Sequence, residues 1–314
     1  MIEDIKVAYV FPGQGSQSVG MGMDLYVHYA AARAVYDEID KILGFSLSRL
    51  CFEGPEQELI QTMNVQPAVL TTSIACLKAA QEASGNKIPV PTFTAGHSLG
   101  EYTALVVSGV LSLADAVRLV RERGRLMHEA GKRKIGGMLA ILGLDLNTVE
   151  NICLAVKVDI SNINSPNQIV VSGPQENLEQ ARRLAQLKGA RRVIPLKVSG
   201  AFHSSLMEPA VEGLRNAINE YNFNTASIPI VANVTAQSIT ETSAIKEELI
   251  SQIVHCVKWQ QSVETMISRG VTTFFEMGPG NVLTGLIKRI SPGAQTFNIN
   301  SVESIQSITN WRRG

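Results

Sequence analysis

The sequence predicts an α/β fold with a mainly parallel sheet, into which a smaller unit is inserted. Toward both ends of the chain, short apolar runs typical of strands alternate with amphipathic helical stretches, which is the order of a parallel sheet covered by helices. Between them, residues 133–198 follow the order strand, helix, strand, strand, helix, strand, which is that of a ferredoxin-like unit. We therefore expect a core of residues 1–132 and 199–314 and a ferredoxin-like subdomain of residues 133–198.

Turn residues and helical periodicity mark the elements of the first part of the core. Residues 6–11 (KVAYVF) form an apolar run that predicts a strand, and the turn cluster PGQGSQSVGMG follows it. A helix is expected to start near Asp24. Further along, the sequence predicts a strand within residues 91–98, a helix over 100–110 and a long amphipathic helix over 112–130.

The inserted unit and the second part of the core continue this pattern. In the insertion we predict strands over 136–144, 158–164, 168–174 and 191–199, with helices over 145–156 and 176–189. The main fold then resumes. It is expected to contain helices over 204–221, 245–254, 259–270 and 281–290, and strands over 228–235 and 272–278.

Composition excludes several classes of protein. The 314 residues include 45% apolar and 18% charged residues and carry no net charge, so the overall charge gives no indication of nucleic acid or an anionic membrane surface. No apolar run reaches the roughly 18 residues that a membrane-spanning helix needs. The first residues are acidic, whereas a signal peptide begins with basic residues. The four cysteines form no CxxC pair, so the sequence gives no sign of a disulfide framework or a zinc site. We expect a cytoplasmic monomer that binds no nucleic acid, membrane or metal.

The stretch Gly96-His97-Ser98-Leu99-Gly100 places one serine between two glycines, where a predicted strand meets a predicted helix. This pattern is typical of a nucleophile elbow, in which the serine sits on a sharp turn and small neighbours let the strand and helix approach closely. An ordinary strand-to-helix turn can have the same pattern, so these five residues alone leave both interpretations open.

The Gly-rich turn at residues 13–17 matches neither common phosphate-binding motif. A dinucleotide fingerprint needs glycine where Ser18 stands, and a P-loop needs Lys followed by Ser or Thr where residues 21–22 are Met-Gly. A serine acyl-transfer enzyme, by contrast, needs two backbone N–H groups that face the oxyanion. Leu99, after the serine, and Gln14, in this turn, are placed to supply them, with a plain turn as the alternative.

Five histidines are candidates for the base that a nucleophilic serine requires. His97 precedes the serine and is expected to point away from it. His28 and His128 lie on amphipathic helices, and His255 lies at a helix end. His203, between a strand and a helix late in the chain, is the best-placed candidate because catalytic residues gather on such loops; a buried structural histidine is the alternative.

Arg123 is the one charged residue that falls on the apolar side of its predicted helix, when residues are placed at about 100° intervals. A buried arginine must be paired, either with a carboxylate of the protein or with one of a substrate. The pattern alone leaves both partners open. The apolar side is made up of Leu113, Ala116, Val117, Val120, Gly124 and Met127.

Together these residues carry a resemblance to a known family. The stretches FPGQGSQ, GHSLGE, GAFHSSLM and FFEMGPGNVLTGL, with an arginine 25 residues after the serine, resemble the malonyl-CoA:acyl-carrier-protein transacylases of bacterial fatty-acid synthesis, from Val10 to about Ile290. The resemblance implies an α/β-hydrolase-like core with a ferredoxin-like subdomain. It implies malonyl-CoA and acyl carrier protein as partners and no cofactor of the enzyme's own, because the partner carries the phosphopantetheine.

Carried over residue by residue, the resemblance implies Ser98 as the nucleophile, His203 as the base and Arg123 as the binder of the malonyl carboxylate. It also implies Gln14 and Leu99 as the donors of the oxyanion N–H groups.

In addition, the resemblance implies that Gln252, seven residues before Trp259, orients His203 through its backbone carbonyl. The family has no acidic third member of the triad, and the sequence offers no obvious aspartate partner for this histidine. Residues 200–202 (Gly-Ala-Phe), just before the histidine, resemble malonyl-selective more than methylmalonyl-selective acyltransferases.

The expected activity is ping-pong transfer of a malonyl group from CoA to the carrier thiol through a serine ester. A discrete acyltransferase of a polyketide assembly line, a serine hydrolase or thioesterase on the same fold, and a docking protein without chemistry are the alternatives. Residues 131–198 hold ten basic and five acidic side chains, which favours docking of an acidic carrier near the insertion, with residues 288–289 as a second surface.

Overall fold

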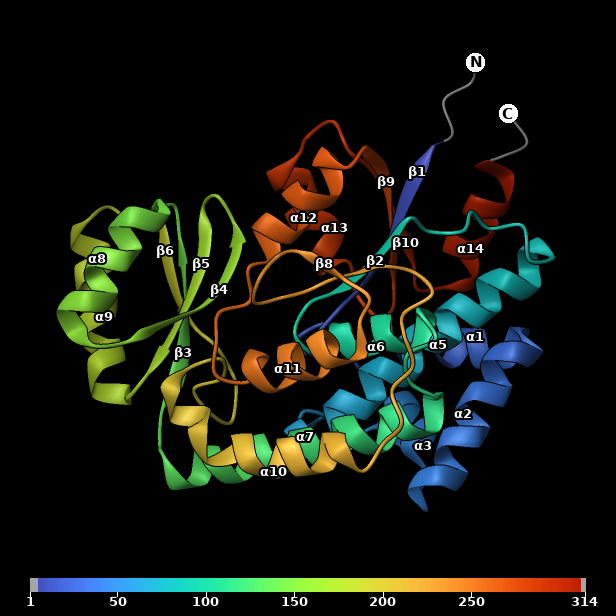
Figure 1. Cartoon of the computed structure of the whole chain (residues 1–314), viewed down its shortest axis with the longest axis horizontal. Helices are drawn as coiled ribbons and strands as arrows, with labels where there is room; N and C mark the ends of the chain where they lie inside the picture. The colour runs from blue at the N-terminus through green and yellow to red at the C-terminus, as the bar shows by residue number, and fades with distance from the viewer. Residues whose placement is uncertain (1–4, 312–314) are drawn as a thin grey trace.

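A computed structural model describes residues 5–311 of the chain, which form two sheets lying side by side (Figure 1). The larger sheet has six strands in the order β10-β9-β1-β2-β7-β8. All neighbouring pairs are parallel except β7 with β8. Its strands are β1 (Lys6–Phe11), β2 (Phe93–Gly96), β7 (Ile230–Val231), β8 (Ser238–Ile239), β9 (Val271–Met277) and β10 (Gln295–Ile299).

The helices around this sheet come from both parts of the sequence. The first part gives α1 (Met23–His28), α2 (Ala30–Leu43), α3 (Leu47–Glu53), α4 (Glu56–Leu59), α5 (Thr62–Ser84), α6 (Leu99–Val107) and α7 (Leu113–Arg133). The second part gives the 3₁₀ turn η1 (Ser205–Met207) and the helices α10 (Glu208–Asn219), α11 (Thr242–Gln252), α12 (Trp259–Ser268), α13 (Val282–Ile290) and α14 (Val302–Trp311).

These helices cover both faces of the large sheet because successive side chains of a strand point to opposite sides. On β1, Val7 and Phe11 enter a core shared with α5 and α6. Ala8 and Val10 enter a second core, shared with α12 and α13. Both faces are therefore apolar, as is usual for parallel strands, and the polar chemistry is left to the ends of the strands.

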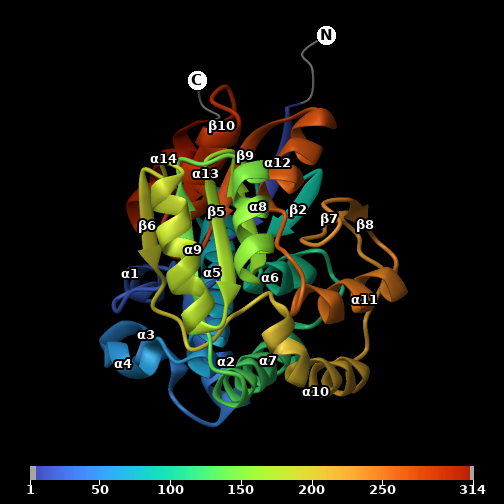
Figure 2. The ribbon, with the colours of Figure 1, turned by 90° about the vertical axis from the view of Figure 1, so that its left-hand side faces the viewer.

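The smaller sheet is antiparallel, with the strand order β4-β5-β3-β6. Its two helices cover the face that is turned away from the large sheet (Figures 1 and 2). A mainly parallel sheet with a separate antiparallel one confirms the predicted fold class. The elements are β3 (Gly137–Leu142), α8 (Leu146–Val156), β4 (Asp159–Ser165), β5 (Gln168–Gly173), α9 (Gln175–Leu187) and β6 (Arg192–Pro195).

The structure contains six elements that were not predicted, α2, α3, α4, α14, β8 and β10, and it differs from the sequence prediction in two further ways that have a clear physical reason. The strand expected over 228–235 is limited to the two residues of β7 because the chain then turns: the Ala232 N–H donates to the Gln237 carbonyl oxygen, and Ala236 has a φ of 57°. The long helix α5 was not predicted, because it is buried on nearly every side and lacks the polar face that makes a helical period visible.

Candidate active site

Ser98 stands at the junction of β2 and α6 in a backbone conformation that few residues adopt. Its φ and ψ are 51° and −104°, and strain of this kind gathers at functional sites. A Cβ on Gly96 would lie 1.9 Å from the backbone carbonyl carbon of Gly100, and a Cβ on Gly100 would lie 2.0 Å from the Phe11 carbonyl oxygen. The two glycines are therefore required by the close approach of α6 to the sheet, which is the geometry of a nucleophile elbow.

His203 faces Ser98 from the loop before η1. Its Nε2 lies 2.7 Å from Ser98 Oγ, and its Nδ1 lies 2.7 Å from the backbone oxygen of Gln252. Since a carbonyl oxygen only accepts hydrogen bonds, Nδ1 carries the proton and Nε2 presents its lone pair to the hydroxyl. Burial, and then the charge of Arg123, lower the pKa of His203 to about 3, so its ring is neutral at pH 7 and can accept a proton.

Arg123, on α7, brings a positive charge to the same place. Its side chain is 1% exposed. Nη1 donates to Gln66 Oε1 at 2.8 Å, and Nη2 donates to Gln252 Oε1 at 2.9 Å and to Ser98 Oγ at 3.1 Å. Its Nε is buried without a hydrogen-bond partner. In residues 5–311, no carboxylate lies within ion-pair distance of this guanidinium.

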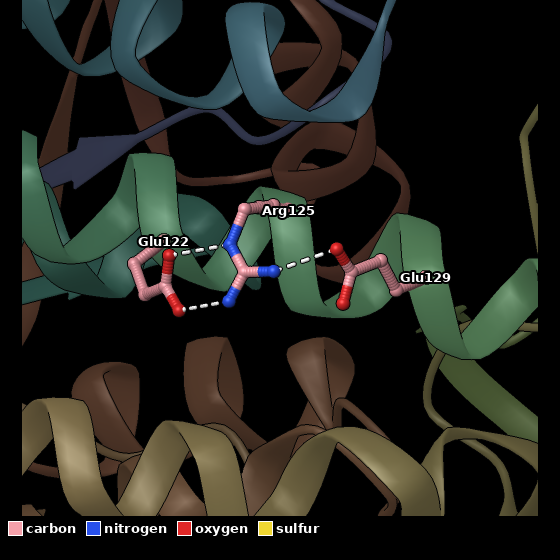
Figure 3. Close-up of polar contacts among 3 residues, drawn as sticks. All are labelled: Glu122, Arg125 and Glu129. Carbon is pink, nitrogen blue, oxygen red and sulfur yellow. Dashed lines mark hydrogen bonds and ion pairs between the residues drawn. The ribbon is translucent and has the colours of Figure 1, made fainter.

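Arg125, two residues further along α7, is paired in the ordinary way. Its guanidinium lies between the carboxylates of Glu122 and Glu129, at 2.5 Å and 2.6 Å (Figure 3). This arginine is 43% exposed, whereas Arg123 is buried. A buried cation without an acid is costly. The surroundings of Arg123 are therefore those expected of a cation whose carboxylate partner arrives with a ligand.

Gln14 and Leu99 line the cavity in front of Ser98. Leu99 is the first residue of α6, where backbone N–H groups have no partner within the helix. The Gly-rich turn presses against the elbow so closely that a Cβ on Gly13 would lie 2.4 Å from the carbonyl oxygen of His97. Both residues predicted to serve the oxyanion thus lie at the same cavity as the serine and the histidine.

This cavity has a volume of about 610 Å³, and its walls are formed by loops and helices around the large sheet and by strands of the small sheet. Met138 and Val170 of the small sheet are among its lining residues. His97, expected to point away from the serine, lines the cavity too, and its Nε2 lies 2.8 Å from Asn164 Oδ1 on β4. His97 therefore ties the elbow to the small sheet.

Three polar residues that hold this site were missed in the sequence. Gln66 accepts a hydrogen bond from Arg123. Asn233 accepts the backbone N–H of Ser98 at the elbow, and Glu101 accepts the backbone N–H of Asn233. A polar residue inside an apolar stretch was the only signal for Gln66, in NVQPAVLTTS, and for Glu101, in the helix after the serine. The residues that were predicted all lie at the cavity or contact its lining: Gln14, Ser98, Leu99, Arg123, His203 and Gln252.

Other chemistry has little support in the part of the chain that the structure describes. No group of three or more His, Cys, Asp or Glu side chains is arranged there to hold a metal ion. Nor is any helix there long and apolar enough to cross a membrane. Burial raises the pKa of Cys51, Cys153 and Cys256 to about 12, so these thiols do not compete with Ser98 as nucleophiles at neutral pH.

The family model of the acyl transferase domain matches residues 8–314. The chain belongs to this family. The malonyl CoA-acyl carrier protein transacylase of Bacillus subtilis (strain 168) is 46% identical to this acyl transferase over 306 residues, which are 96% of this chain and 95% of that protein. The protein of the same name from Staphylococcus aureus (strain N315) is 40% identical over 311 residues, 98% of each chain.

Solved structures agree with this membership. An acyl carrier protein S-malonyltransferase from Vibrio cholerae superimposes with a TM-score of 0.92 at 40% identity, over 96% of this acyl transferase and 99% of that chain. A malonyl-transacylase in complex with its type II PKS acyl-carrier protein gives a TM-score of 0.93 at 38% identity, over 98% and 100% of the two chains. The family resemblance predicted from the sequence motifs is thereby confirmed.

Proposed function

We propose that this acyl transferase moves a malonyl group from malonyl-CoA to the phosphopantetheine thiol of an acyl carrier protein, as the names of its relatives state for those proteins. The observation that supports the malonyl group is Arg123, a buried cation that donates to Ser98 Oγ and forms no ion pair with any acid of residues 5–311. A malonyl ester on that oxygen has a free carboxylate within reach of the guanidinium, which binds carboxylates in bidentate fashion.

In the first half-reaction, Ser98 Oγ attacks the thioester carbonyl carbon of malonyl-CoA while His203 Nε2 accepts the hydroxyl proton. The backbone N–H groups of Leu99 and Gln14 stabilise the oxyanion. When the tetrahedral intermediate collapses, the C–S bond breaks, and the proton on His203 goes to the leaving CoA thiolate. A malonyl ester remains on the serine, with its carboxylate on Arg123.

In the second half-reaction, the thiol of the carrier's phosphopantetheine attacks the ester, and His203 accepts the thiol proton. The same two N–H groups hold the second oxyanion. The Ser98 alkoxide leaves, takes the proton back from His203, and malonyl-carrier protein departs. Each half-reaction uses the same groups in the same roles because both replace one acyl acceptor by another.

The test is to incubate the protein with malonyl-CoA, measure its intact mass and map the modified peptide. A malonyl ester on Ser98 that holo-carrier protein then removes is the expected result, with Ser98→Ala as the control. An adduct elsewhere, or none, contradicts the mechanism. His203→Ala is expected to slow acylation by about 10²–10⁴-fold, the usual contribution of a general base.

The same incubation separates the alternatives. Free malonate as the main product would identify a hydrolase or thioesterase on this fold, and malonyl-carrier protein identifies the transferase. Comparing a fatty-acid carrier with a polyketide carrier as acceptor distinguishes the two assembly lines, and we propose the fatty-acid one because the sequence motifs resemble the transacylases of bacterial fatty-acid synthesis.

We also propose that residues 1–132 and 199–314 form the catalytic core and that residues 133–198 form a subdomain. The separate antiparallel sheet, built from residues 137–195, supports this division. The monomeric state and the cytoplasmic location stay predictions.

A further inference from the structure

Glu101 is a buried acid beside the reacting groups, and the mechanism above does not use it. It lies in the first turn of α6, and 1% of its side chain is exposed. Both of its oxygens accept hydrogen bonds: Oε1 from the Asn233 backbone N–H at 3.1 Å, and Oε2 from the side-chain amide of Gln252. Each of these donors is itself bonded to the catalytic groups.

The contact with Asn233 leads to the elbow. The side chain of Asn233 accepts the Ser98 backbone N–H on Oδ1 at 2.7 Å and donates from Nδ2 to the Gly96 carbonyl oxygen at 2.7 Å. One side chain thus bridges the two ends of the turn that holds the serine at its positive φ. Glu101 fixes the backbone from which that side chain extends.

The contact with Gln252 leads to the base and to the cation. The Gln252 backbone oxygen holds His203 Nδ1, and its side-chain Oε1 accepts from Arg123. The side-chain Nε2 donates both to Glu101 and, at 3.1 Å, to the Ser98 carbonyl oxygen. A flipped amide would turn its NH₂ toward the guanidinium and its oxygen toward two other oxygens, so Glu101 selects the orientation that serves the site.

We propose that Glu101 is a positioning residue: its two acceptor oxygens fix Gln252 and Asn233, and these hold the reacting groups in place. The family has no acid bonded directly to the histidine, and in this chain Glu101 is linked to His203 through Gln252. The proposal rests on the proposed function, because it assigns Glu101 a part in the same Ser98 chemistry.

The first test is Glu101→Gln, which keeps the shape but turns one acceptor into a donor. In either orientation its NH₂ faces the Asn233 N–H or the Gln252 Nε2, both of which only donate, so the network cannot be satisfied with Gln252 in its present orientation. The readout is the rate at which an alkyl fluorophosphonate labels Ser98. In this reaction the serine oxygen bonds to phosphorus, fluoride leaves and His203 takes the proton.

The probe carries neither a malonyl group nor a thioester. Its rate therefore reports on Ser98 and His203 even if the proposed acyl donor is wrong, and malonyl transfer is measured separately. We expect labelling of folded Glu101→Gln to be about ten- to a hundredfold slower than that of the parent, the cost of a small misplacement of reacting groups. Labelling at the parental rate would overturn the proposal.

Glu276→Gln is the matched control. Glu276, on β9, is another buried acid, 1% exposed, and its two oxygens accept the backbone N–H groups of Leu283 at 3.0 Å and Thr284 at 2.7 Å. Glutamine disturbs two accepted N–H bonds there as well, but neither donor bonds to the catalytic groups or to Gln252, so labelling by the folded variant is expected to stay at the parental rate. If Glu276→Gln slowed labelling as much as Glu101→Gln did, the effect would belong to any loss of a buried acid, and the proposal would fail.

A double-mutant cycle tests the route through Gln252. The variant Gln252→Ala keeps the backbone oxygen that holds His203 but removes the side chain on which Glu101 acts. We expect Glu101→Gln to slow labelling less in this background than in the parent. Equal effects in both backgrounds would overturn the route. If Glu101→Gln does not fold, Glu101→Asp, which keeps both acceptors on a shorter side chain, is expected to show a smaller loss with the same dependence on Gln252.

Discussion

Arg123→Ala removes the buried guanidinium while leaving Ser98 and His203 in place. Among the described residues, this arginine donates hydrogen bonds to neutral groups, the amide oxygens of Gln66 and Gln252 and the serine hydroxyl. Its loss therefore breaks no direct ion pair among these residues, although its charge also acts on the nearby buried Glu101. A malonyl ester on Ser98, in contrast, would leave its carboxylate in a buried site without a cation.

The expected size of the effect follows from that stranded charge. Truncating one partner of a buried, hydrogen-bonded charge pair costs about 2–5 kcal/mol, much of which is the penalty on the partner left behind. At about 1.4 kcal/mol for each factor of ten, malonyl transfer should fall by about 30-fold to several thousandfold. An acetyl group carries no charge, so acetyl transfer should stay at the parental rate or rise. The ratio of malonyl to acetyl transfer should fall by the same factor.

The assay measures single-turnover acylation of Ser98 by malonyl-CoA and by acetyl-CoA, quenched and read by intact mass. Arg125→Ala is the matched control, because it removes an arginine from the same helix that already has two acidic partners (Figure 3). It is expected to leave the ratio unchanged. An unchanged ratio in folded Arg123→Ala would refute the assignment and place malonyl selectivity elsewhere.

Three further predictions follow from charges in the structure. The pKa of His203 is about 3 in the folded chain, against 6.5 for a free histidine, so between these pH values the unfolded chain binds a proton that the folded chain does not. The folded state therefore loses stability relative to the unfolded state as pH falls through that window. The unfolding free energy of the parent minus that of His203→Ala should fall by about 1 kcal/mol from about pH 6 to about pH 5, and a rise would contradict the prediction. Arg289 donates to Gln168, which lines the cavity, whereas Arg182 and Arg183 lie on α9, a helix on the side of the small sheet that is turned away from the large sheet (Figure 2). Arg289→Glu should therefore raise the KM for carrier protein more than the KM for malonyl-CoA, and more than the Arg182→Glu/Arg183→Glu double variant does. Equal changes in the two KM values would count against docking at Arg289. Because Arg125 is 43% exposed, Arg125→Ala should lower the unfolding free energy by no more than about 1 kcal/mol in thermal or urea melts.

The fold could be predicted from the sequence wherever local pattern and burial agree. The apolar runs at β1 and β9 and the amphipathic period of α7 give their elements directly, because each is defined by one or two buried faces. The shortness of β7 could not be foreseen: residues 228–235 have the composition of a full strand, and it is the turn after Val231 that ends the pairing. The helix α5 could not be predicted because it is buried on nearly every side, so its sequence shows no alternation of apolar and polar faces from which a helical period could be detected.

In the site, too, some residues could be predicted from the sequence and others could not. Ser98, His203 and Arg123 were accessible to sequence reasoning because each breaks a local rule: a serine between glycines, a histidine between a strand and a helix, and a cation on an apolar face. Glu101 gives only the weak signal of a polar residue in an apolar helix, and Asn233 gives none. Their roles come from hydrogen bonds between positions more than 130 residues apart, such as that of the Asn233 backbone N–H to Glu101, which no local pattern encodes.

The cavity wall that comes from the small sheet has a consequence for how such a chain can diversify. The nucleophile, base and cation all come from the large unit, while Met138 and Val170 line the same cavity from the antiparallel sheet. These two side chains pack into the core that also contains Leu99 and Phe202, so substitutions there can reshape the space for the acyl chain or the pantetheine arm only as far as that shared packing allows. Chemistry and substrate shape come from different parts of the chain, but one core joins them, and selection on the shape of the cavity is limited by the packing that supports the elbow.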